Sequence, residues 1–416
     1  MSADSYAHHF SIANIPFGIA SSSTHPAPAA VTRIRDHVIF LDALLEDGVF
    51  RNTKGLPRNV FQQSTLNNFA ALGRESATSV RTAIQQAFKP DSNYKPPLNA
   101  VIPVSQVKMH MPVHVGDFTD FSCSEDHVVN AGEAVFGKRA VPPGFPHYPL
   151  GYGGRSSSIV ISETPVQRPL GQYRSKTEQD NVLFGPCQDL DYELELACII
   201  GKPVRMGDIA TAADADEHIF GVVLLNDWSA RDILGLEIVP LGPLNGKSFT
   251  TSISPWVVTL DALAPFAIPA AVHSSPVAPY LEDPNPNGTY SLELTAEVLS
   301  GGLATQVCVA KLEWARWSFR HIFAHQAIGG CGLGSGDIIA TGTLSGKTLQ
   351  ALGCLLEMTM NGKRPFKLKD GSIRTFLEDG DGVRITGFAG TPNDGVGFGE
   401  CVGVINPALT LSRGVQ

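Results

Sequence analysis

The sequence of 416 residues contains no apolar run of the roughly 20 residues that a membrane-spanning helix requires, and residues 219–225 predict at most a buried strand. The first residues lack the basic region and apolar core of a secretory signal, so we expect a cytoplasmic protein. Seven cysteines are scattered along the chain, and none forms a Cys-x-x-Cys pair. Zinc ribbons and redox dithiols are therefore unsupported, and reduced thiols are expected.

Charge is also sparse, and no basic stripe concentrates it. Charged residues make up 17% of the chain and the formal net charge is -9, so we expect no nucleic-acid partner. No internal repeat or low-complexity tract is present. Hydrophobic residues reach 43%, in short runs rich in Val, Ile and Phe, among 41 glycines and 29 prolines. This composition predicts a β-rich globular protein, long enough for more than one domain.

Two helices are predicted from local patterns. Residues 76–88 predict one in the first part of the chain, followed by a Pro-rich loop at 89–97. Ala315, Phe319, Ile322 and Phe323 recur at the spacing of one helix face, which predicts an amphipathic helix near residues 310–329.

The most informative local pattern is an acidic pair in a predicted strand, LDYELEL at residues 190–196. Successive side chains of a strand point to opposite faces, so Glu193 and Glu195 share one face while Tyr192 and Leu194 lie on the other. Adjacent carboxylates beside a core repel each other unless they are protonated, exposed or bridged by a cation. A solvated strand face is the simple alternative, and a divalent cation bound through oxygen is the functional one.

Three further polar clusters accompany this pair, and each alone is weak evidence. They are DFTDFSCSEDH at 117–127, LLNDWSARD at 224–232 and LGPLNGKSF at 241–249. His127 alone is more often a structural or surface histidine than a base. Asp227 is equally well placed to cap a helix that begins at Trp228.

Taken together in this order, the clusters resemble the fumarylacetoacetase family. Further matching stretches are SIANIPFG at 11–18, PLGYGGR at 149–155, ATGTLSG at 340–346 and FLEDGD at 376–381. The resemblance therefore covers essentially the whole chain, and NDWSARD is a highly specific motif.

The resemblance implies a β-rich α+β fold of two parts. A small SH3-like barrel would occupy residues 1–115, and a larger mixed β-roll of the fumarylacetoacetase type would occupy residues 116–416. It also implies a homodimer that hydrolyses a carbon–carbon bond next to a carbonyl of a small β-diketone, without an organic cofactor.

The resemblance further implies a metal site built from carboxylates. The ligands carried over onto this chain are Asp120, Glu193, Glu195 and Asp227. Carboxylate oxygens suit Mg²⁺ or Ca²⁺ and fit zinc poorly. Lys247 and Thr251 stand where family members support the metal.

The catalytic residues that the resemblance implies are His127 with Glu357, and Arg231 with Lys247. A histidine oriented by a carboxylate can remove a proton from water, which is otherwise too weak a nucleophile at neutral pH. Arg231 and Lys247 would stabilise the oxyanion that develops during attack. Without the resemblance, Glu357 would be read as an outward-facing strand residue.

The chain departs from the family among residues that contact substrate. Family members carry tyrosine where Ser122 stands, arginine at Phe136, glutamine at Leu234 and tyrosine at Ile238. Gly153 stands where family members usually carry a histidine. The other implied substrate contacts, Tyr152, Arg231 and Thr343, keep their polar groups.

These losses carry a measurable cost for an anionic substrate. A charge-assisted hydrogen bond to a carboxylate contributes roughly 1.5–3 kcal/mol. Losing two such contacts would weaken binding of a doubly anionic substrate by about a hundredfold or more.

The leading hypothesis is a metal-dependent enzyme on the fumarylacetoacetase scaffold, acting on a less charged, more hydrophobic β-dicarbonyl compound. Its reaction would be C–C hydrolysis, or decarboxylation, tautomerisation or C–C bond formation by related metal-enolate chemistry. The alternative within enzymes is fumarylacetoacetate hydrolysis in tyrosine breakdown. The alternative of another class is a non-catalytic metal-binding scaffold, which the retained His127, Glu357, Lys247 and Arg231 disfavour.

Overall fold

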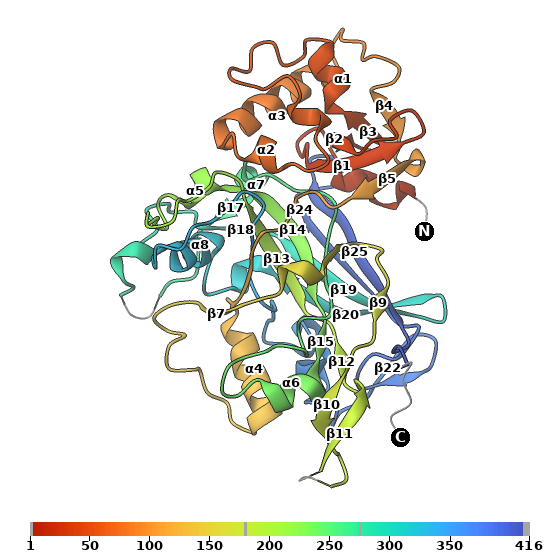
Figure 1. Ribbon diagram of the computed structural model, residues 1–416, viewed down its shortest axis with the longest axis vertical. Helices are drawn as coiled ribbons and strands as arrows, with labels where there is room; N and C mark the ends of the chain where they lie inside the picture. Colours follow the sequence, from red (N-terminus) through yellow and green to blue (C-terminus); the bar gives the residue numbers. More distant parts are fainter. Residues whose placement is uncertain (1–2, 179–180, 274–275, 411–416) are drawn as a thin grey trace.

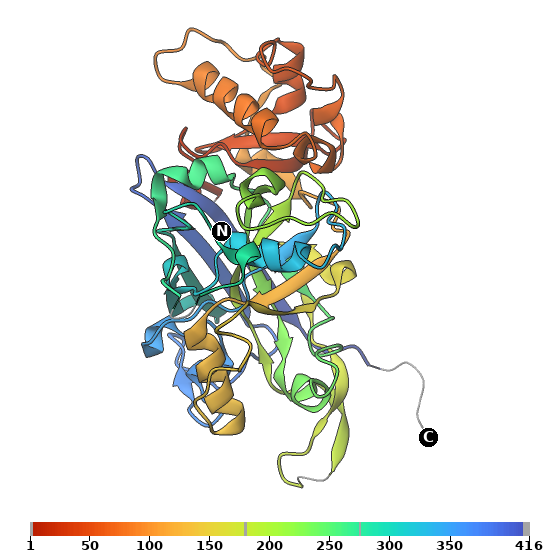
Figure 2. The same cartoon turned by 90° about the vertical axis from the view of Figure 1, so that its left-hand side faces the viewer.

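The computed structural model describes residues 3–178, 181–273 and 276–410. The chain forms a β-rich α+β fold, with the N-terminal segment at one end of an elongated molecule (Figure 1). A view turned by 90° keeps that segment at the same end (Figure 2). None of the described helices combines the length and the hydropathy of a membrane span.

The N-terminal segment contains an antiparallel sheet in the order β4-β3-β2-β1-β5. Its strands are β1 (Phe17–Ser22), β2 (Ala29–Ile34), β3 (His37–Phe40), β4 (Val101–Pro103) and β5 (Val107–His110). Its helices are α1 (Leu41–Glu46), α2 (Asn67–Ala70) and α3 (Arg74–Phe88). The prediction of a helix at residues 76–88 is confirmed by α3, which buries the apolar stripe Ala77, Val80 and Ile84.

The site is built on a mixed sheet in the order β7-β6-β21-β13-β14-β16-β8. Its parallel pairs are β6 with β21 and β8 with β16, and its other pairs are antiparallel. The strands are β6 (Phe118–Ser122), β7 (Leu150–Gly153), β8 (Ile159–Ile161), β13 (Leu194–Ile200), β14 (Ile219–Asp227), β16 (Thr251–Ile253) and β21 (Ile338–Ala340).

A third sheet, in the order β20-β19-β24-β25-β9, packs against the site sheet through the core that contains Leu194 and Leu294. Its long strands run lengthwise through the molecule (Figure 1). They are β9 (Val166–Gln167), β19 (Glu293–Ser300), β20 (Leu303–Lys311), β24 (Gly382–Ala389) and β25 (Val396–Asn406).

The remaining elements are short, and several border the site. They are β10 (Leu170–Arg174), β11 (Val182–Pro186), β12 (Leu190–Asp191), β15 (Ser229–Ala230), β17 (Ala267–Ile268), β18 (Thr289–Tyr290), β22 (Phe366–Lys367), β23 (Ile373–Arg374), α4 (Glu125–Phe136), α5 (Ala215–His218), α6 (Arg231–Glu237), α7 (Leu260–Leu263), α8 (Phe319–Ala327) and α9 (Leu355–Met358).

Strand β13 lies between two hydrophobic cores. Leu194, Leu196 and Cys198 belong to the core that includes the third sheet, with residues such as Leu294 and Ile385. The alternate residues of β13, Ala197 and Ile199, belong to a second core with N-terminal residues such as Phe17 and Phe69. Because both faces of β13 are covered by apolar side chains, the strand is a rigid support for the residues at its end.

The predicted strand over residues 190–200 is interrupted. β12 ends at Asp191 and β13 begins at Leu194, so Glu193 precedes the strand that carries Glu195. Side chains replace the ladder at the break, since the Asn226 side-chain oxygen accepts a hydrogen bond from the Glu193 backbone N–H at 3.2 Å. Both glutamates nevertheless turn toward the same cluster, described below.

The predicted amphipathic helix near residues 310–329 is shorter than its spacing suggested. It is α8, which begins at Phe319 after Ser318 closes a capping box with His321. Ala315 therefore lies ahead of the helix rather than on its face. Ala315 is nevertheless buried, because it packs in the core that includes the third sheet.

The predicted division of the chain at residue 115 falls between β5 and β6. The two segments share the second core, and Phe17 pairs with Val257 across them. The five-stranded pairing of the N-terminal sheet alone does not establish an SH3-like barrel, so that fold and the boundary stay predictions.

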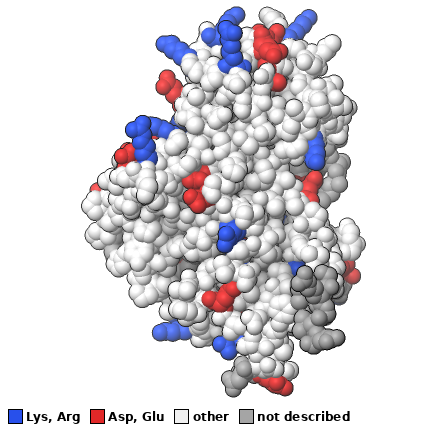
Figure 3. Space-filling view, viewed as in Figure 1, with Lys and Arg blue, Asp and Glu red and all other residues white. Residues whose placement is uncertain are grey.

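Charged side chains of both signs are mixed over the face shown in Figure 3, and much of its middle is uncharged. No basic stripe is visible on the face shown.

Candidate active site

A cavity of about 670 Å³ opens between α4, α6 and the strands β6 and β7. Polar side chains line one part of it: Asp120, His127, Tyr152, Glu193, Arg231, Lys247 and Thr343. Apolar side chains line the rest, among them Val128, Val135, Phe136, Val141, Leu150, Leu234, Ile238 and Leu356. The cavity therefore joins a buried polar end to an apolar wall, which is the usual form of a small-molecule site.

The sheet order brings the predicted metal ligands together. Asp120 lies on β6 opposite Ala340 of β21, and β21 in turn pairs with β13, which carries Glu195. Asp227 ends β14, the neighbour of β13 on its other side. Glu193 stands just before β13. Carboxylates that are far apart in the sequence thus meet at one place in the sheet.

The four carboxylates form a closed, buried cluster. Asp120, Glu193, Glu195 and Asp227 each offer an oxygen, and these oxygens lie within 4.8 Å of one another. All four residues are at most 4% exposed. Both oxygens of Glu195 and Oδ1 of Asp120 have no hydrogen-bond partner among the described residues. Unpartnered buried carboxylate oxygens at this spacing fit a hard divalent cation.

Lys247 and Arg231 contact only two of the four carboxylates, those of Glu193 and Asp227. Lys247 donates to Glu193 and, at 2.7 Å, to Oδ2 of Asp227. Arg231 Nη1 lies 2.8 Å from Glu193. Thr251 Oγ1 donates to Oδ1 of Asp227 at 2.7 Å. Lys247 and Thr251 therefore act as hydrogen-bond donors to the cluster, and a lysine ammonium has no lone pair with which to bind a metal.

The pKa shifts follow this division only in part, because burial raises the pKa of Asp227 as well, despite its contact with Lys247. Burial raises the pKa of Asp120 to about 7, and the nearby Asp227 adds to the rise. Burial and the charge of Asp120 raise the pKa of Glu195 well above its ordinary value. Burial would also raise the pKa of Glu193, but Lys247 and Arg231 outweigh it and hold that pKa below its ordinary value. The two carboxylates without a protein cation are those that a metal ion would keep ionised.

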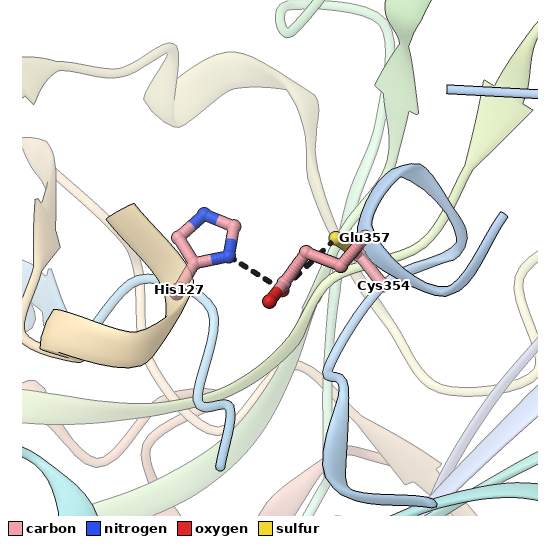
Figure 4. Close-up of side chains that lie close together, drawn as sticks. All are labelled: His127, Cys354 and Glu357. Atoms are coloured by element: carbon pink, nitrogen blue, oxygen red, sulfur yellow. Dashed lines mark hydrogen bonds and ion pairs between the residues drawn. The ribbon is translucent and has the colours of Figure 1, made fainter. Parts of the chain in front are cut away.

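The predicted pair His127 and Glu357 is in contact. His127 Nδ1 lies 2.7 Å from Glu357 Oε1, where α4 meets the short helix α9. Figure 4 shows the imidazole directed at this carboxylate, with the Cys354 sulfur also beside it. With a proton on Nδ1, Nε2 carries the free lone pair of a base. The His127 side chain is 12% exposed and lines the cavity, whereas Glu357 is fully buried.

Residues that the sequence analysis missed hold Glu357 in place. Ser345 Oγ donates to its Oε1 at 2.6 Å, and Asn130 Nδ2 donates to its Oε2 at 3.0 Å. Asn130 follows His127 by three positions on α4, a spacing that places both side chains on one helix face. Ser345 lies in the ATGTLSG motif, but only the fold shows that it faces Glu357.

Arg231 is held by a third missed residue, Asp191. The Arg231 Nε donates to Asp191 Oδ2 at 2.8 Å. Asp191 also accepts the backbone N–H groups of Leu355 and Leu356, at 2.7 and 2.8 Å. The Nη2 group of Arg231 is buried without a partner among the described residues. One donor of Arg231 is therefore left for a molecule in the cavity.

The alternative interpretations of two residues fail on this geometry. Asp227 does not cap a helix, because its carboxylate contacts Lys247, Thr251 and Tyr152, and α6 begins only at Arg231. Glu357 is not an outward strand residue, because it lies on α9 with 2% exposure.

The predicted substrate residues all line the cavity: Ser122, Phe136, Tyr152, Arg231, Leu234, Ile238 and Thr343. Tyr152 OH donates to Asp227 Oδ2 at 3.1 Å, so it is tied to the carboxylate cluster. The Thr343 hydroxyl is buried without a partner among the described residues. Phe136, at 75% exposure, stands at the C-terminal end of α4.

Comparison with known proteins agrees with this architecture. The family model described as "Fumarylacetoacetate (FAA) hydrolase C-terminal" matches residues 117–405, and "Fumarylacetoacetase N-terminal" matches residues 13–112. The fumarylacetoacetase of Aspergillus fumigatus is 43% identical over 97% of both chains. The human fumarylacetoacetase is 37% identical, also over 97% of both.

Solved structures share the fold at lower identity. Fumarylacetoacetate hydrolase from the psychrophile Exiguobacterium antarcticum matches with a TM-score of 0.52 and 17% identity, over 94% of this chain and 99% of that one. On the sequence matches, the enzyme class predicted above, a hydrolase of carbon–carbon bonds, is that of the chain's curated relatives. The chain belongs to the fumarylacetoacetase family.

Proposed function

We propose that this chain is a divalent-metal-dependent hydrolase that cleaves the carbon–carbon bond of a β-diketone, with fumarylacetoacetate as its substrate. One observation carries the reaction: a His127–Glu357 pair, a free Arg231 donor and a closed carboxylate cluster all border one cavity. Full-length relatives named fumarylacetoacetase support the choice of substrate.

The metal would be held by Asp120, Glu193, Glu195 and Asp227, and their all-oxygen set favours Mg²⁺ or Ca²⁺. When bound, such an ion supplies Lewis-acid stabilisation of negative charge on the diketone oxygens. Lys247 and Thr251 would orient Asp227, and Lys247 would also orient Glu193, through the hydrogen bonds described above.

The protein's own side chains would transfer the proton and stabilise the negative charge that develops on the substrate oxygen. His127 Nε2 would take a proton from water as the water oxygen attacks a carbonyl carbon, and Glu357 would stabilise the imidazolium. Arg231 Nη2 would donate to the resulting oxyanion. Collapse breaks the C–C bond, releases a carboxylic acid, and leaves an enolate that regains the proton from His127.

One cationic side chain, Lys138, favours an anionic substrate although Phe136 replaces the arginine of family members. Lys138 lines the cavity at its exposed rim and forms no hydrogen bond or ion pair within the described residues. It would receive a substrate carboxylate that an arginine at position 136 binds in family members. This compensation is specific to substrates with a negatively charged end.

A second candidate substrate class follows from the apolar wall. Phe136, Leu234 and Ile238 line the cavity where family members carry polar side chains. A less charged, more hydrophobic β-dicarbonyl compound would lose less on desolvation against this wall than fumarylacetoacetate would.

One assay separates these substrates and tests the reaction. Purified protein with Mg²⁺ is given fumarylacetoacetate and a panel of uncharged β-diketones, and loss of ultraviolet absorbance is followed. Glu195→Gln, which removes one carboxylate charge while keeping its shape, is the matched control. Faster metal-dependent turnover of the uncharged compounds supports the second class; no turnover of any compound by folded, metal-binding protein overturns the hydrolase proposal and favours a non-catalytic scaffold.

We also propose a cytoplasmic homodimer of two-part chains, divided near residue 115. All seven cysteines are free, which suits a reducing compartment. Exposed apolar side chains on β11, Val182 and Phe184, and in the loop after α6, Val239 and Leu241, offer surface for a second copy. Analytical ultracentrifugation tests this, since a monomer across micromolar concentrations would contradict it.

A further inference from the structure

The His127–Glu357 pair has a third neighbour that the proposed reaction does not use. The sulfur of Cys354 lies 3.4 Å from Glu357 Oε1. Ligand atoms of His127, Cys354 and Glu357 all lie within 4.8 Å of one another. Figure 4 shows the imidazole nitrogen and the sulfur both linked to the one carboxylate. Nitrogen, sulfur and oxygen donors thus meet at one point.

This donor set differs in kind from the carboxylate cluster. Four carboxylates select hard cations such as Mg²⁺ and Ca²⁺. Imidazole and thiolate select Zn²⁺, which takes mixed N, S and O ligands in tetrahedral geometry. The two clusters therefore suit different metals.

The local fold presents these ligands from two elements. Cys354 is the N-cap residue of α9, and Glu357 lies three positions later in its first turn. His127 lies on α4 and lines the cavity, whereas Cys354 and Glu357 are buried behind it, so an ion would reach the three atoms past the imidazole. Three protein ligands with a fourth position left for water is a common zinc arrangement.

Zinc ligation and the hydrogen bond between His127 and Glu357 exclude each other. Two ligands about 2.0–2.1 Å from a tetrahedral ion lie roughly 3.3 Å apart. The Nδ1–Oε1 distance of 2.7 Å is too short for that, so the two atoms must separate before both can bind one ion. A bound ion would also occupy the imidazole nitrogen whose proton orients the base.

We infer that His127, Cys354 and Glu357 form a Zn²⁺ site that, when filled, switches off the catalytic base. Binding releases the thiol proton of Cys354 to solvent, and the Nδ1 proton of His127 moves to Nε2, which then has no free lone pair with which to act as a base. The binding itself is independent of the proposed function, whereas its inhibitory effect rests on it.

Cobalt is the spectroscopic probe for the site, because a thiolate bound to Co²⁺ gives a charge-transfer absorption. Full-length protein saturated with Mg²⁺ is titrated with Co²⁺, and Zn²⁺ affinity is measured by calorimetry. The wild type should show the thiolate band, and Cys354→Ser should lack it. Loss of this ligand should weaken Zn²⁺ binding by at least about 100-fold.

Matched variants distinguish this site from metal binding at other residues of the chain. Cys331→Ser, at a partly buried cysteine whose sulfur bonds only Gln326, should keep the band. Glu195→Gln should keep it too, since that residue belongs to the other cluster. His127→Asn, which removes a ligand at the cavity surface without altering the buried helix α9, should weaken Zn²⁺ binding in folded protein.

The outcomes are distinguishable from failure of the proposed function. Absence of the band in the wild type, or its persistence in Cys354→Ser, overturns the proposed site whatever the enzyme hydrolyses. A band without inhibition of turnover by Zn²⁺ overturns the switch. Absence of turnover with every substrate overturns the hydrolase proposal while the band still decides the metal site.

Discussion

Arg231 and Lys247 reach the same buried cluster but differ in what they have left to offer. The ammonium of Lys247 donates to Glu193 and Asp227, both of which are buried. The guanidinium of Arg231 bonds Asp191 and Glu193 and keeps Nη2 without a partner among the described residues. Arg231 therefore has a free donor for a developing oxyanion, and Lys247 serves mainly to fix the carboxylates.

Replacing His127 tests the base directly. We expect His127→Gln to lower kcat by about 10²–10⁴, because general-base catalysis contributes that much. KM for the substrate and affinity for Mg²⁺ should change little, since His127 is outside the carboxylate cluster. Steady-state kinetics with Mg²⁺ calorimetry provide the measurement. A kcat close to that of the wild type would contradict the assignment.

Replacing Lys138 tests the substrate's charge. We expect Lys138→Met to raise KM for fumarylacetoacetate about 5- to 10-fold with little change in kcat, because a charge-assisted contact at the rim is lost. KM for an uncharged β-diketone should not rise. Lys54→Met, at an exposed lysine of the N-terminal segment, is the control. An equal rise for charged and uncharged substrates would rule out a carboxylate contact.

Among single residues, the catalytic and metal-binding side chains were easier to predict from the sequence than the residues that hold them in place. The resemblance to the fumarylacetoacetase family located the carboxylates, the histidine and Arg231, because each polar cluster alone is weak evidence. Asp191 and Ser345 were missed as site residues, since their roles depend on backbone N–H groups and a carboxylate brought near by the fold. The spacing of Asn130 from His127 could have identified it.

Helix α9 shows how one short element positions the site. Asp191 accepts its N-terminal N–H groups from Leu355 and Leu356 and also binds Arg231. One fully buried carboxylate thus fixes the oxyanion donor relative to the helix that carries Glu357. A carboxylate at a helix N-terminus is also favoured by the helix dipole.

Breaking this link should cost both stability and activity. We expect Asp191→Asn to lower the free energy of unfolding by about 3–5 kcal/mol, because buried Arg231 loses one of its two charge partners and keeps only Glu193. Urea unfolding with kinetics on the folded fraction measures both effects. Glu217→Gln removes an exposed ion pair with Lys202 and should cost at most about 1 kcal/mol. Equal effects of the two substitutions would contradict this role for Asp191.

Element types were easier to predict than their ends. Helix α3 follows its apolar stripe closely, because Ala77, Val80 and Ile84 are buried at helical spacing. The break after Asp191 was not predictable from alternation, since an Asn226 side chain takes over a backbone hydrogen bond there. The start of α8 at Phe319 depends on a Ser318–His321 capping box that periodicity does not contain.

The whole molecule should respond to pH through the carboxylate cluster when no metal is bound. Asp120 has a folded-state pKa of about 7 and Glu195 one well above its ordinary value, so the folded chain holds more protons than the unfolded chain. Stability must then fall as pH rises. Buried His9 and His321, with pKa values of about 3 and about 4, affect stability only at lower pH.

We therefore expect the melting temperature of chelator-treated protein to fall as the pH rises from about 6.5, above which the buried histidines no longer oppose the change, through the Asp120 pKa of about 7. Mg²⁺ should reverse this, and at 100 times its Kd it should add about 2.7 kcal/mol of stability. Scanning calorimetry with and without Mg²⁺ makes the measurement. Glu195→Gln should flatten the pH dependence; an unchanged slope in this variant would assign it to other groups.

Because the N-terminal and C-terminal segments share the second core, the order in which they are synthesised on the ribosome affects folding. The N-terminal sheet emerges first, yet Phe17 packs on Phe220 and pairs with Val257, and Phe10 pairs with Val396 near the end of the chain. Its apolar face has no cover until those later strands are made. The nascent protein must keep that face from aggregating for most of its translation, so its yield in cells should depend strongly on chaperones that bind early.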